Sequence, residues 1–279
     1  MEVIDLHLHT NLSDGLLSPD RVVELAKQKQ CKLISITDHE IITDFSDLEE
    51  KYNIEIINGI EFNSSVSNMH LLGYSIQDLD TIKTCMDNLR KENENVVLKV
   101  IDMLNRAGYN VTESKVVDYL CGIGLNADIL DKRKLVKYLI YMGYADSVID
   151  CYNKLIGKNQ EFYVPNRKMT PFEIINLVNL CGGFVSIAHP ETLQISKIEL
   201  EKELLKLIKM GLCGIETFNK KKDFNNSVFY YSLAKQYNLI PTCGSDFHSY
   251  DTDEIGVEID SKSYDLLKEK VIKEKVIKY

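Results

Sequence analysis

The sequence predicts a protein of the α/β class, and three observations lead to that class. Short runs rich in Ile, Val and Leu recur along the chain. Polar and apolar residues alternate only weakly within these runs, as is typical of strands buried on both faces. Several runs are followed by segments that carry the start and stop signals of helices. Strands that alternate with helices predict a parallel sheet or a barrel.

Seven strands are expected, each short and rich in aliphatic side chains. In chain order they are Val3–Leu8, Leu33–Thr37, Ile54–Ile60, His70–Tyr74, Phe184–Ala188, Gly214–Phe218 and Ile240–Gly244. Ser18-Pro19 and Thr170-Pro171 mark helix starts, because a hydroxyl cap followed by Pro suits the first helical turn. Glu173 completes a capping box with Thr170, and Gly182 follows that helix as a C-terminal glycine.

The segment between the fourth and fifth strands has an almost purely helical pattern. Apolar residues recur at helical spacing over Ile82–Leu104, and Gly108 ends this stripe. Further helices are predicted at Ser114–Leu120, Asp131–Tyr141 and Asp146–Leu155. We therefore interpret residues 80–156 as a helical insertion domain. The main domain is then discontinuous, formed by residues 1–79 and 157–279, and it ends in an amphipathic helix.

Composition excludes several classes of protein. A chain of 279 residues, 44% hydrophobic and 27% charged, can form one large α/β domain with an insertion. Its formal charge of −9 has the wrong sign for non-specific binding to nucleic acid or to an anionic membrane. We expect neither a transmembrane helix nor a secretory signal, since the required apolar runs are missing. Seven scattered cysteines without a C-x-x-C pair fit reduced thiols in a cytoplasmic protein.

All six histidines lie at or just past an end of a predicted strand, where acidic residues accompany them. Period-2 alternation places the imidazoles of His7 and His9 on one side of the backbone, so both can reach one ion. Asp14 follows them in a turn-forming loop. The remaining potential ligands are His39, Glu61, His70, His189, Asp246 and His248. Because one ion needs only three or four ligands, nine suggest two or three ions. Mixed nitrogen and oxygen ligands without thiolates favour Mn, Fe or Zn.

Five short motifs contain most of these residues. They are H-x-H at His7, T-D-H at Thr37–His39, G-x-E at Gly59–Glu61, A-H-P at Ala188–Pro190 and G-S-D-x-H at Gly244–His248. Their order resembles that in the PHP (polymerase and histidinol phosphatase) family of metal-dependent phosphoesterases. The resemblance covers nearly the whole chain. It implies a distorted seven-stranded (β/α) barrel with a metal cluster at the carboxyl ends of the strands.

The resemblance also implies a distribution of the ligands over three ions. His7, His9, Glu61 and Asp246 would hold one ion. Glu61 would bridge to a second ion bound by His70 and His189. Asp14, His39 and His248 would hold the third. Among the acids outside this set, Glu216, Asp5 and Asp38 are candidates to orient the histidines.

The insertion most resembles the branch that hydrolyses nucleoside 3′,5′-bisphosphates and trims short RNA from the 5′ end. The implied reaction is phosphomonoester hydrolysis by a hydroxide that bridges two cations, with Mn²⁺ favoured and Asp246 handling the proton. Arg133 and Arg167 are candidates for binding phosphate, and Lys220–Lys222 could ring the mouth of the site. The G-R-P-H run usual in that branch is replaced by Lys132-Arg133-Lys134-Leu135, which retains only the arginine.

Three hypotheses therefore stand. The first is a cytoplasmic phosphoesterase that acts on small phosphorylated nucleotides or short RNA, and not on long nucleic acid or at a membrane. The second is a phosphatase for a non-nucleotide metabolite such as histidinol phosphate. The third is a metal-binding module without turnover, against which the complete set of nine ligands counts.

Overall fold

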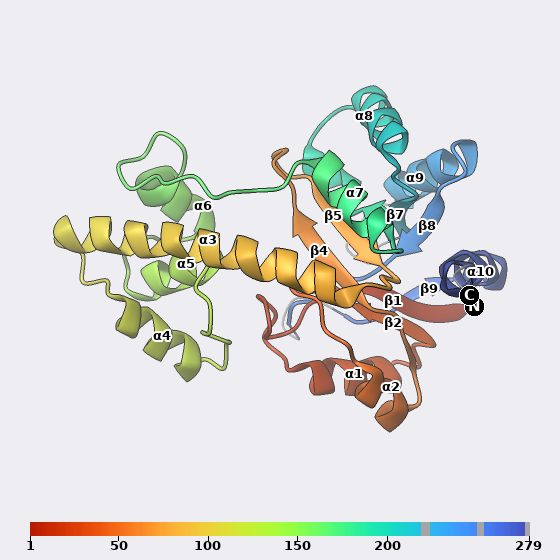
Figure 1. The fold of residues 1–279 in the computed structure, drawn as a ribbon, viewed down its shortest axis with the longest axis horizontal. Coiled ribbons are helices and arrows are strands. Elements are labelled where there is room, and N and C mark those ends of the chain that lie inside the picture. Colours follow the sequence, from red (N-terminus) through yellow and green to blue (C-terminus); the bar gives the residue numbers. More distant parts are fainter. Residues whose placement is uncertain (219–223, 250–253, 277–279) are drawn as a thin grey trace. The chain divides into compact units, whose positions relative to one another are not determined.

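The computed structural model describes residues 1–218, 224–249 and 254–276 (Figure 1). It divides into two compact units. The first comprises Met1–Thr84 and Met169–Tyr279, and the second comprises Cys85–Lys168. The second unit begins and ends later than the expected insertion. Helix α3 (Leu79–Arg106) runs through the first boundary without a break, and Phe162 belongs to the apolar core of the second unit. That the units are separate domains stays a prediction.

The strands of the first unit form two sheets, with the orders β3-β2-β1-β9 and β4-β5-β6-β7-β8. The strands are β1 (Glu2–Leu8), β2 (Leu33–Ile36), β3 (Glu55–Ile56), β4 (Gly59–Asn63), β5 (His70–Tyr74), β6 (Phe184–Ile187), β7 (Gly214–Phe218), β8 (Ile240–Cys243) and β9 (Val257–Ile259). The pairs β1–β2, β2–β3, β6–β7 and β7–β8 are parallel. The pairs β1–β9, β4–β5 and β5–β6 are antiparallel, so the sheets are mixed.

A closed seven-stranded barrel is not confirmed, since the described residues form nine strands in two sheets and neither sheet closes on itself. The expected strand over Ile54–Ile60 is divided between β3 and β4, which belong to different sheets. The three residues of β9 are too short a run to be recognised from the sequence. Two isolated parallel bridges link the sheets, Leu8 with Phe247 and His39 with Glu61. The α/β class itself is confirmed.

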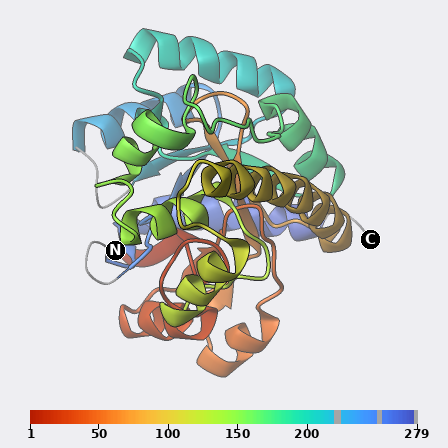
Figure 2. The same ribbon diagram turned by 90° about the vertical axis from the view of Figure 1, so that its left-hand side faces the viewer.

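Helices cover the outer faces of both sheets in the first unit. Figures 1 and 2 both show α1 (Pro19–Gln28) beside α2 (Ser46–Tyr52) at the β1–β2 side. The second sheet packs against α7 (Pro171–Leu180) and α9 (Phe224–Gln236), with α8 (Lys197–Met210) next to α7 and a 3₁₀ turn at Pro190–Leu193. Helix α10 (Ser261–Val276) contacts β8. The expected caps are confirmed: Ser18 accepts from the Arg21 backbone, and Thr170 forms a capping box with Glu173.

The second unit is helical throughout its described residues, as the sequence predicts. Besides most of α3 it contains α4 (Glu113–Gly122), α5 (Lys132–Tyr141), α6 (Val148–Cys151) and a π-helical turn at Tyr152–Ile156. Its core includes Val97, Leu104, Leu120 and Leu139, each fully buried. Within the described parts of the whole chain, no helix is both long enough and apolar enough to cross a bilayer.

Candidate metal centre

All nine predicted ligands belong to the first unit and meet along the line where its two sheets adjoin. His7 is in β1, and His9, His39, His189 and Asp246 follow the strands β1, β2, β6 and β8. His70 is the first residue of β5 and reaches the same edge because β5 runs antiparallel to β4 and β6. Its carbonyl accepts a hydrogen bond from the Ala188 backbone, next to His189. The strand reversal therefore brings the start of one strand level with the ends of its neighbours.

The nine side chains form four groups in which one nitrogen or oxygen atom per residue lies within 4.8 Å of the others. The groups are His7, His9 and Asp246; His7, Glu61 and His189; His39, Glu61 and His70; and His9, Asp14, His39 and His248. The first and last groups match two of the implied ion sites closely. His70 and His189 fall in different groups, each with Glu61, instead of sharing one. The assignment of particular ligands to particular ions stays a prediction.

The Glu61 carboxylate is the centre of the cluster. Oε1 lies 2.9 Å from His70 Nδ1 and 3.0 Å from His189 Nε2. Oε2 faces three further rings, with Nε2 atoms at 3.1 Å (His9), 3.3 Å (His39) and 3.4 Å (His7). Burial alone would raise the pKa of Glu61, but the surrounding histidines, His39 and His7 foremost, hold this pKa well below its usual range. Glu61 is thus an ionised carboxylate that five imidazoles share.

His7 and His9 are completely buried, and their ring nitrogens suit a cation. His7 Nε2 and both ring nitrogens of His9 make no hydrogen bond of acceptable geometry, although carboxylate oxygens lie nearby. Buried polar atoms are normally hydrogen-bonded, so these three nitrogens need another partner. Burial opposes protonation of both rings, but the nearby carboxylates outweigh it. They raise the pKa of His7 well above 6.5 and that of His9 to about 10. Divalent cations fit this donor set, since they would replace the protons on these rings.

Two of the candidate ligands have strained backbone. His189 has φ 24° and Asp246 has φ 56°, in the left-handed region that non-glycine residues rarely adopt. Strand β1 holds Asp246 in place, since the Asp246 N–H donates to the His7 carbonyl at 2.9 Å. Such strain is typical of functional sites, where the surrounding structure enforces it.

Comparison with known proteins agrees with this geometry. The profile of the PHP domain matches residues 5–164, more than half of the chain. The chain belongs to the PHP family. As a PHP protein it is a metal-dependent phosphoesterase.

Three curated proteins show how far the likeness extends. The chain is 23% identical to the 5′-3′ exoribonuclease Rnm of Escherichia coli over 255 residues, covering 88% of this chain and 85% of the relative. It is 26% identical over 259 residues to the phosphoribosyl 1,2-cyclic phosphate 1,2-diphosphodiesterase of Eggerthella lenta, covering 88% and 93%. It is 22% identical over 255 residues to the 3′,5′-nucleoside bisphosphate phosphatase of Chromobacterium violaceum, covering 89% and 88%.

A solved structure shares the fold. A protein of known structure from Bifidobacterium adolescentis superposes with a TM-score of 0.77 at 20% identity, covering 95% of both chains. The PHP fold therefore extends over both units of this chain.

The acids expected to orient histidines in this PHP protein have different roles. Asp5 accepts from the backbone N–H groups of His7, Ser245 and Gly256, at 3.2, 2.9 and 2.8 Å. Asp38 accepts from the backbone and hydroxyl of Thr10 and from the Ser13 hydroxyl. These two carboxylates anchor the backbone of the ligand-bearing loops. Glu216 does contact a ring, because its Oε1 lies 3.1 Å from His7 Nδ1.

Two residues that contact candidate histidine ligands are not predicted from the sequence. Asn63 Nδ2 lies 3.3 Å from His39 Nδ1, and the Asn63 backbone N–H donates to Glu40. Alternation along β4 places Asn63 on the same face as Glu61, and that spacing could have revealed it. Thr192 Oγ1 lies 3.0 Å from His189 Nδ1. Its position three residues after the histidine, at the first turn past the strand, is a weaker signal.

The candidate phosphate-binding arginines belong to the second unit. Arg133 Nη2 lies 3.1 Å from Asp131 Oδ2, at the start of α5. Arg167 Nη1 lies 2.9 and 3.0 Å from the two oxygens of Glu92. Each guanidinium thus has a carboxylate partner within its own unit. Lys220–Lys222 lie outside the described residues.

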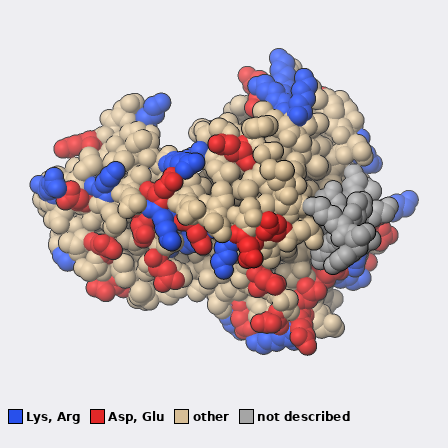
Figure 3. All heavy atoms as spheres, viewed as in Figure 1, with Lys and Arg blue, Asp and Glu red and all other residues tan. Residues whose placement is uncertain are grey.

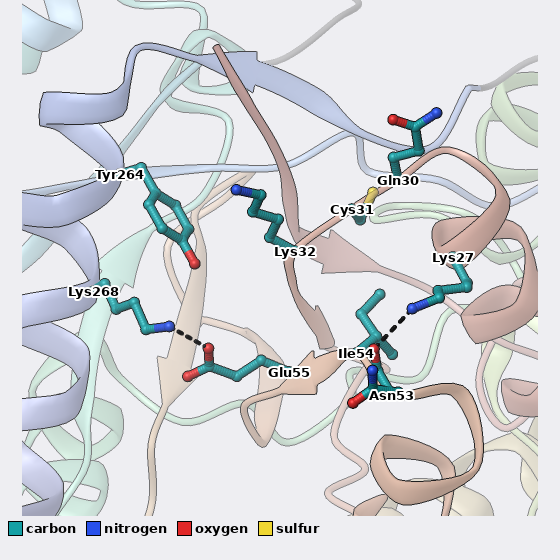
Figure 4. A pocket seen from close by; sticks show the side chains of 9 residues that line it. All are labelled: Lys27, Gln30, Cys31, Lys32, Asn53, Ile54, Glu55, Tyr264 and Lys268. Atoms are coloured by element: carbon teal, nitrogen blue, oxygen red, sulfur yellow. Dashed lines mark hydrogen bonds and ion pairs between the residues drawn. The ribbon is translucent and has the colours of Figure 1, made fainter.

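A cavity of about 450 Å³ in the first unit is separate from this cluster (Figure 4). Its lining includes Lys32 and Glu55, which precede β2 and begin β3, so it lies at the opposite end of β2 from His39. The ammonium of Lys268 pairs with Glu55, that of Lys32 pairs with Glu2, and that of Lys27 donates to the Asn53 carbonyl. The lysines of the cavity are therefore satisfied by acceptors of the chain itself.

Proposed function

We propose that this PHP protein hydrolyses phosphomonoesters of small nucleotides, such as nucleoside 3′,5′-bisphosphates, and acts on the 5′ end of short RNA. The observation that carries the proposal is the cluster of nine ligands around Glu61, with buried imidazole nitrogens that lack hydrogen bonds. The names of the Escherichia coli exoribonuclease and the Chromobacterium violaceum phosphatase support this choice of substrates. Acidic and basic side chains are intermixed on the face that Figure 3 shows. The formal charge of −9 favours small substrates over long nucleic acid.

The cofactors would be two or three divalent cations, with Mn²⁺ favoured and Fe or Zn as alternatives. His7, His9, His39, His70, His189 and His248 would hold them together with Asp14, Glu61 and Asp246. When bound, such cations supply Lewis acidity toward phosphoryl oxygens and make water a stronger acid. The carboxylates of Asp14, Glu61 and Asp246 would offset part of the charge of these cations. The remaining positive charge would attract the phosphate group of a substrate.

Asp246 is the proposed proton acceptor. Its side chain is 27% exposed, whereas that of Glu61 is 1% exposed, so a substrate or water can reach Asp246. Burial raises the pKa of Asp246, but His7 and His9 outweigh that effect and hold the pKa below its usual range. The carboxylate is therefore ionised at neutral pH, with oxygens that can bind a cation or take up a proton, but the lowered pKa also makes it a weaker base than an ordinary aspartate. Arg133 and Arg167 are proposed to bind phosphate by bidentate hydrogen bonds.

A second candidate function is hydrolysis of a cyclic phosphodiester. The relative from Eggerthella lenta carries that activity in its name and has the highest identity of the three relatives, 26%. The metal cluster would suit this reaction as well, because both reactions need a water-derived nucleophile to attack a phosphoryl group held beside the cations. We also propose a cytoplasmic location for either activity, since none of the seven cysteines takes part in a disulfide.

The test is phosphate release by metal-stripped protein reloaded with Mn²⁺. The substrates are adenosine 3′,5′-bisphosphate, a 5′-phosphorylated short RNA, a ribosyl 1,2-cyclic phosphate, histidinol phosphate and an aryl phosphate. We expect turnover of the first two, lost in Asp246→Asn and retained in Asp87→Asn, which removes a surface carboxylate 43% exposed on α3. Turnover of only the cyclic ester would favour the second candidate. Turnover of only histidinol or aryl phosphate would overturn the proposed substrates.

A further inference from the structure

Glu216 is a buried carboxylate that joins two of the candidate ligands without belonging to any of the four groups. It lies in the middle of β7, and its side chain is 1% exposed. Oε1 lies 3.1 Å from His7 Nδ1. Oε2 accepts a hydrogen bond from the backbone N–H of His189 at 2.6 Å. One side chain therefore contacts ligands supplied by β1 and by the end of β6.

The contact with His7 determines which ring nitrogen can bind an ion. An ionised carboxylate only accepts hydrogen bonds, so the proton of a neutral His7 ring is placed on Nδ1. Nε2 then carries a free electron pair. This Nε2 is buried, makes no hydrogen bond, and lies 3.5 Å from Asp246 Oδ1 and 3.4 Å from Glu61 Oε2. Glu216 therefore turns the coordinating nitrogen of His7 toward the other candidate ligands.

The contact with His189 holds a strained backbone. His189 has φ 24° and ψ 67°, a conformation that persists only when its surroundings enforce it. The 2.6 Å hydrogen bond from its N–H to Glu216 is one such constraint. It fixes the peptide from which the His189 ring reaches Glu61, 3.0 Å away at Oε1.

We propose that Glu216 is a positioning residue of the metal centre. It fixes the Nδ1–H form of His7 and the backbone of His189, so that both rings present Nε2 to the cations. This inference rests on the proposed function, since it concerns the same cations. Carboxylates that hold metal-binding histidines in this way change metal affinity by about 10- to 100-fold when they are removed.

Mn²⁺ binding to metal-stripped Glu216→Gln tests the proposal, with free Mn²⁺ measured by electron paramagnetic resonance. Glutamine keeps the shape of glutamate but offers one oxygen, so at most one of the two N–H groups finds its acceptor. We expect binding about 10- to 100-fold weaker than in the wild type. The matched control is Ser186→Ala, which removes a buried hydrogen bond to Thr242 between the strands that flank β7. Its affinity should stay close to that of the wild type.

Each outcome has a separate meaning. Equal affinity in Glu216→Gln and the wild type would overturn the positioning role alone. Equal weakening in Ser186→Ala would show that any loss of buried polar contacts has the same effect, and it would overturn the role as well. If the wild type itself bound no Mn²⁺, the metal centre of the proposed function would fail.

A second measurement on the wild type covers the case in which Glu216→Gln does not fold. Nuclear magnetic resonance of ¹⁵N-histidine-labelled, Zn²⁺-loaded protein distinguishes the two ring nitrogens, and the His7 signals are assigned through their loss in His7→Asn. We expect the ring proton of His7 on Nδ1. A proton-free Nδ1 would overturn the proposal without any variant at position 216.

Discussion

The backbone at Gly244 leaves no room for a side chain. Replacing this glycine tests how closely the segment after β8 packs against His7 in β1. A Cβ at this position would lie 2.3 Å from His7 Cβ, 2.6 Å from His7 N and 2.9 Å from His7 Cα. Ordinary contacts begin near 3.4 Å, so Gly244→Ala has to push the end of β8 away from β1 by about 1 Å. The obstructing atoms belong to backbone and Cβ, which cannot rotate away.

The displacement would act directly on the candidate centre. Asp246 is two residues further on, and its N–H donates to the His7 carbonyl. A shift of about 1 Å at a catalytic group can lower activity by about 100-fold, and overpacking of this kind costs about 1–3 kcal/mol of stability. We therefore expect Gly244→Ala to lose about 100-fold in kcat/KM and to bind Mn²⁺ more weakly, while remaining folded.

The assays are kcat/KM with adenosine 3′,5′-bisphosphate, Mn²⁺ affinity and urea unfolding. Gly122→Ala is the matched control, because a Cβ there meets nothing within 4 Å and the residue ends helix α4. That variant should keep wild-type activity and Mn²⁺ affinity. Gly244→Ala with wild-type activity and affinity would refute the close packing of His7 against the end of β8.

Further predictions concern stability, protonation and substrate binding. Tyr74→Phe removes the buried 2.7 Å hydrogen bond from the Tyr74 hydroxyl to the Leu6 carbonyl, and should cost about 1–2 kcal/mol in urea unfolding; an unchanged midpoint would contradict that bond. The pKa of His9 is raised from 6.5 to about 10, so its protonated form stabilises the metal-free fold fully below pH 6.5. The free energy of unfolding of the metal-free protein should therefore fall between pH 6.5 and 10. Mn²⁺ binding at pH 7 should release protons, and calorimetry of Mn²⁺ binding in buffers of different ionisation enthalpy measures that release. Arg133→Lys should raise KM about 10-fold with little change in kcat, whereas a change confined to kcat would argue against phosphate binding in the ground state.

The residues of the candidate centre can be predicted because their signals are local. His7 and His9 are two residues apart at the end of one expected strand, and Glu61 directly follows the expected strand Ile54–Ile60. The caps at Ser18 and Thr170 are equally local, since each depends on the next three residues. Such features need no knowledge of which strands are neighbours.

Strand direction and long-range partners could not be predicted in the same way. Nothing in the composition of His70–Tyr74 distinguishes an antiparallel strand from a parallel one, because both faces are buried in either case. The orienting role of Glu216 depends on a partner 209 residues away, and Asp5 and Asp38 resemble it in the sequence while binding backbone instead. These roles follow from pairing between distant segments, which periodicity does not encode.

The bridge between Leu8 and Phe247 has a consequence for synthesis of the protein on the ribosome. It joins residues near the two ends of the chain, and candidate ligands lie beside both of them, His7 and His9 on one side and Asp246 and His248 on the other. Domains generally fold as units as the nascent chain emerges. The β4–β5 hairpin with Glu61 and His70 can form early, but the cluster stays incomplete until residue 248 has left the exit tunnel. Cation capture by the full set of ligands therefore has to follow synthesis of every segment between His7 and His248.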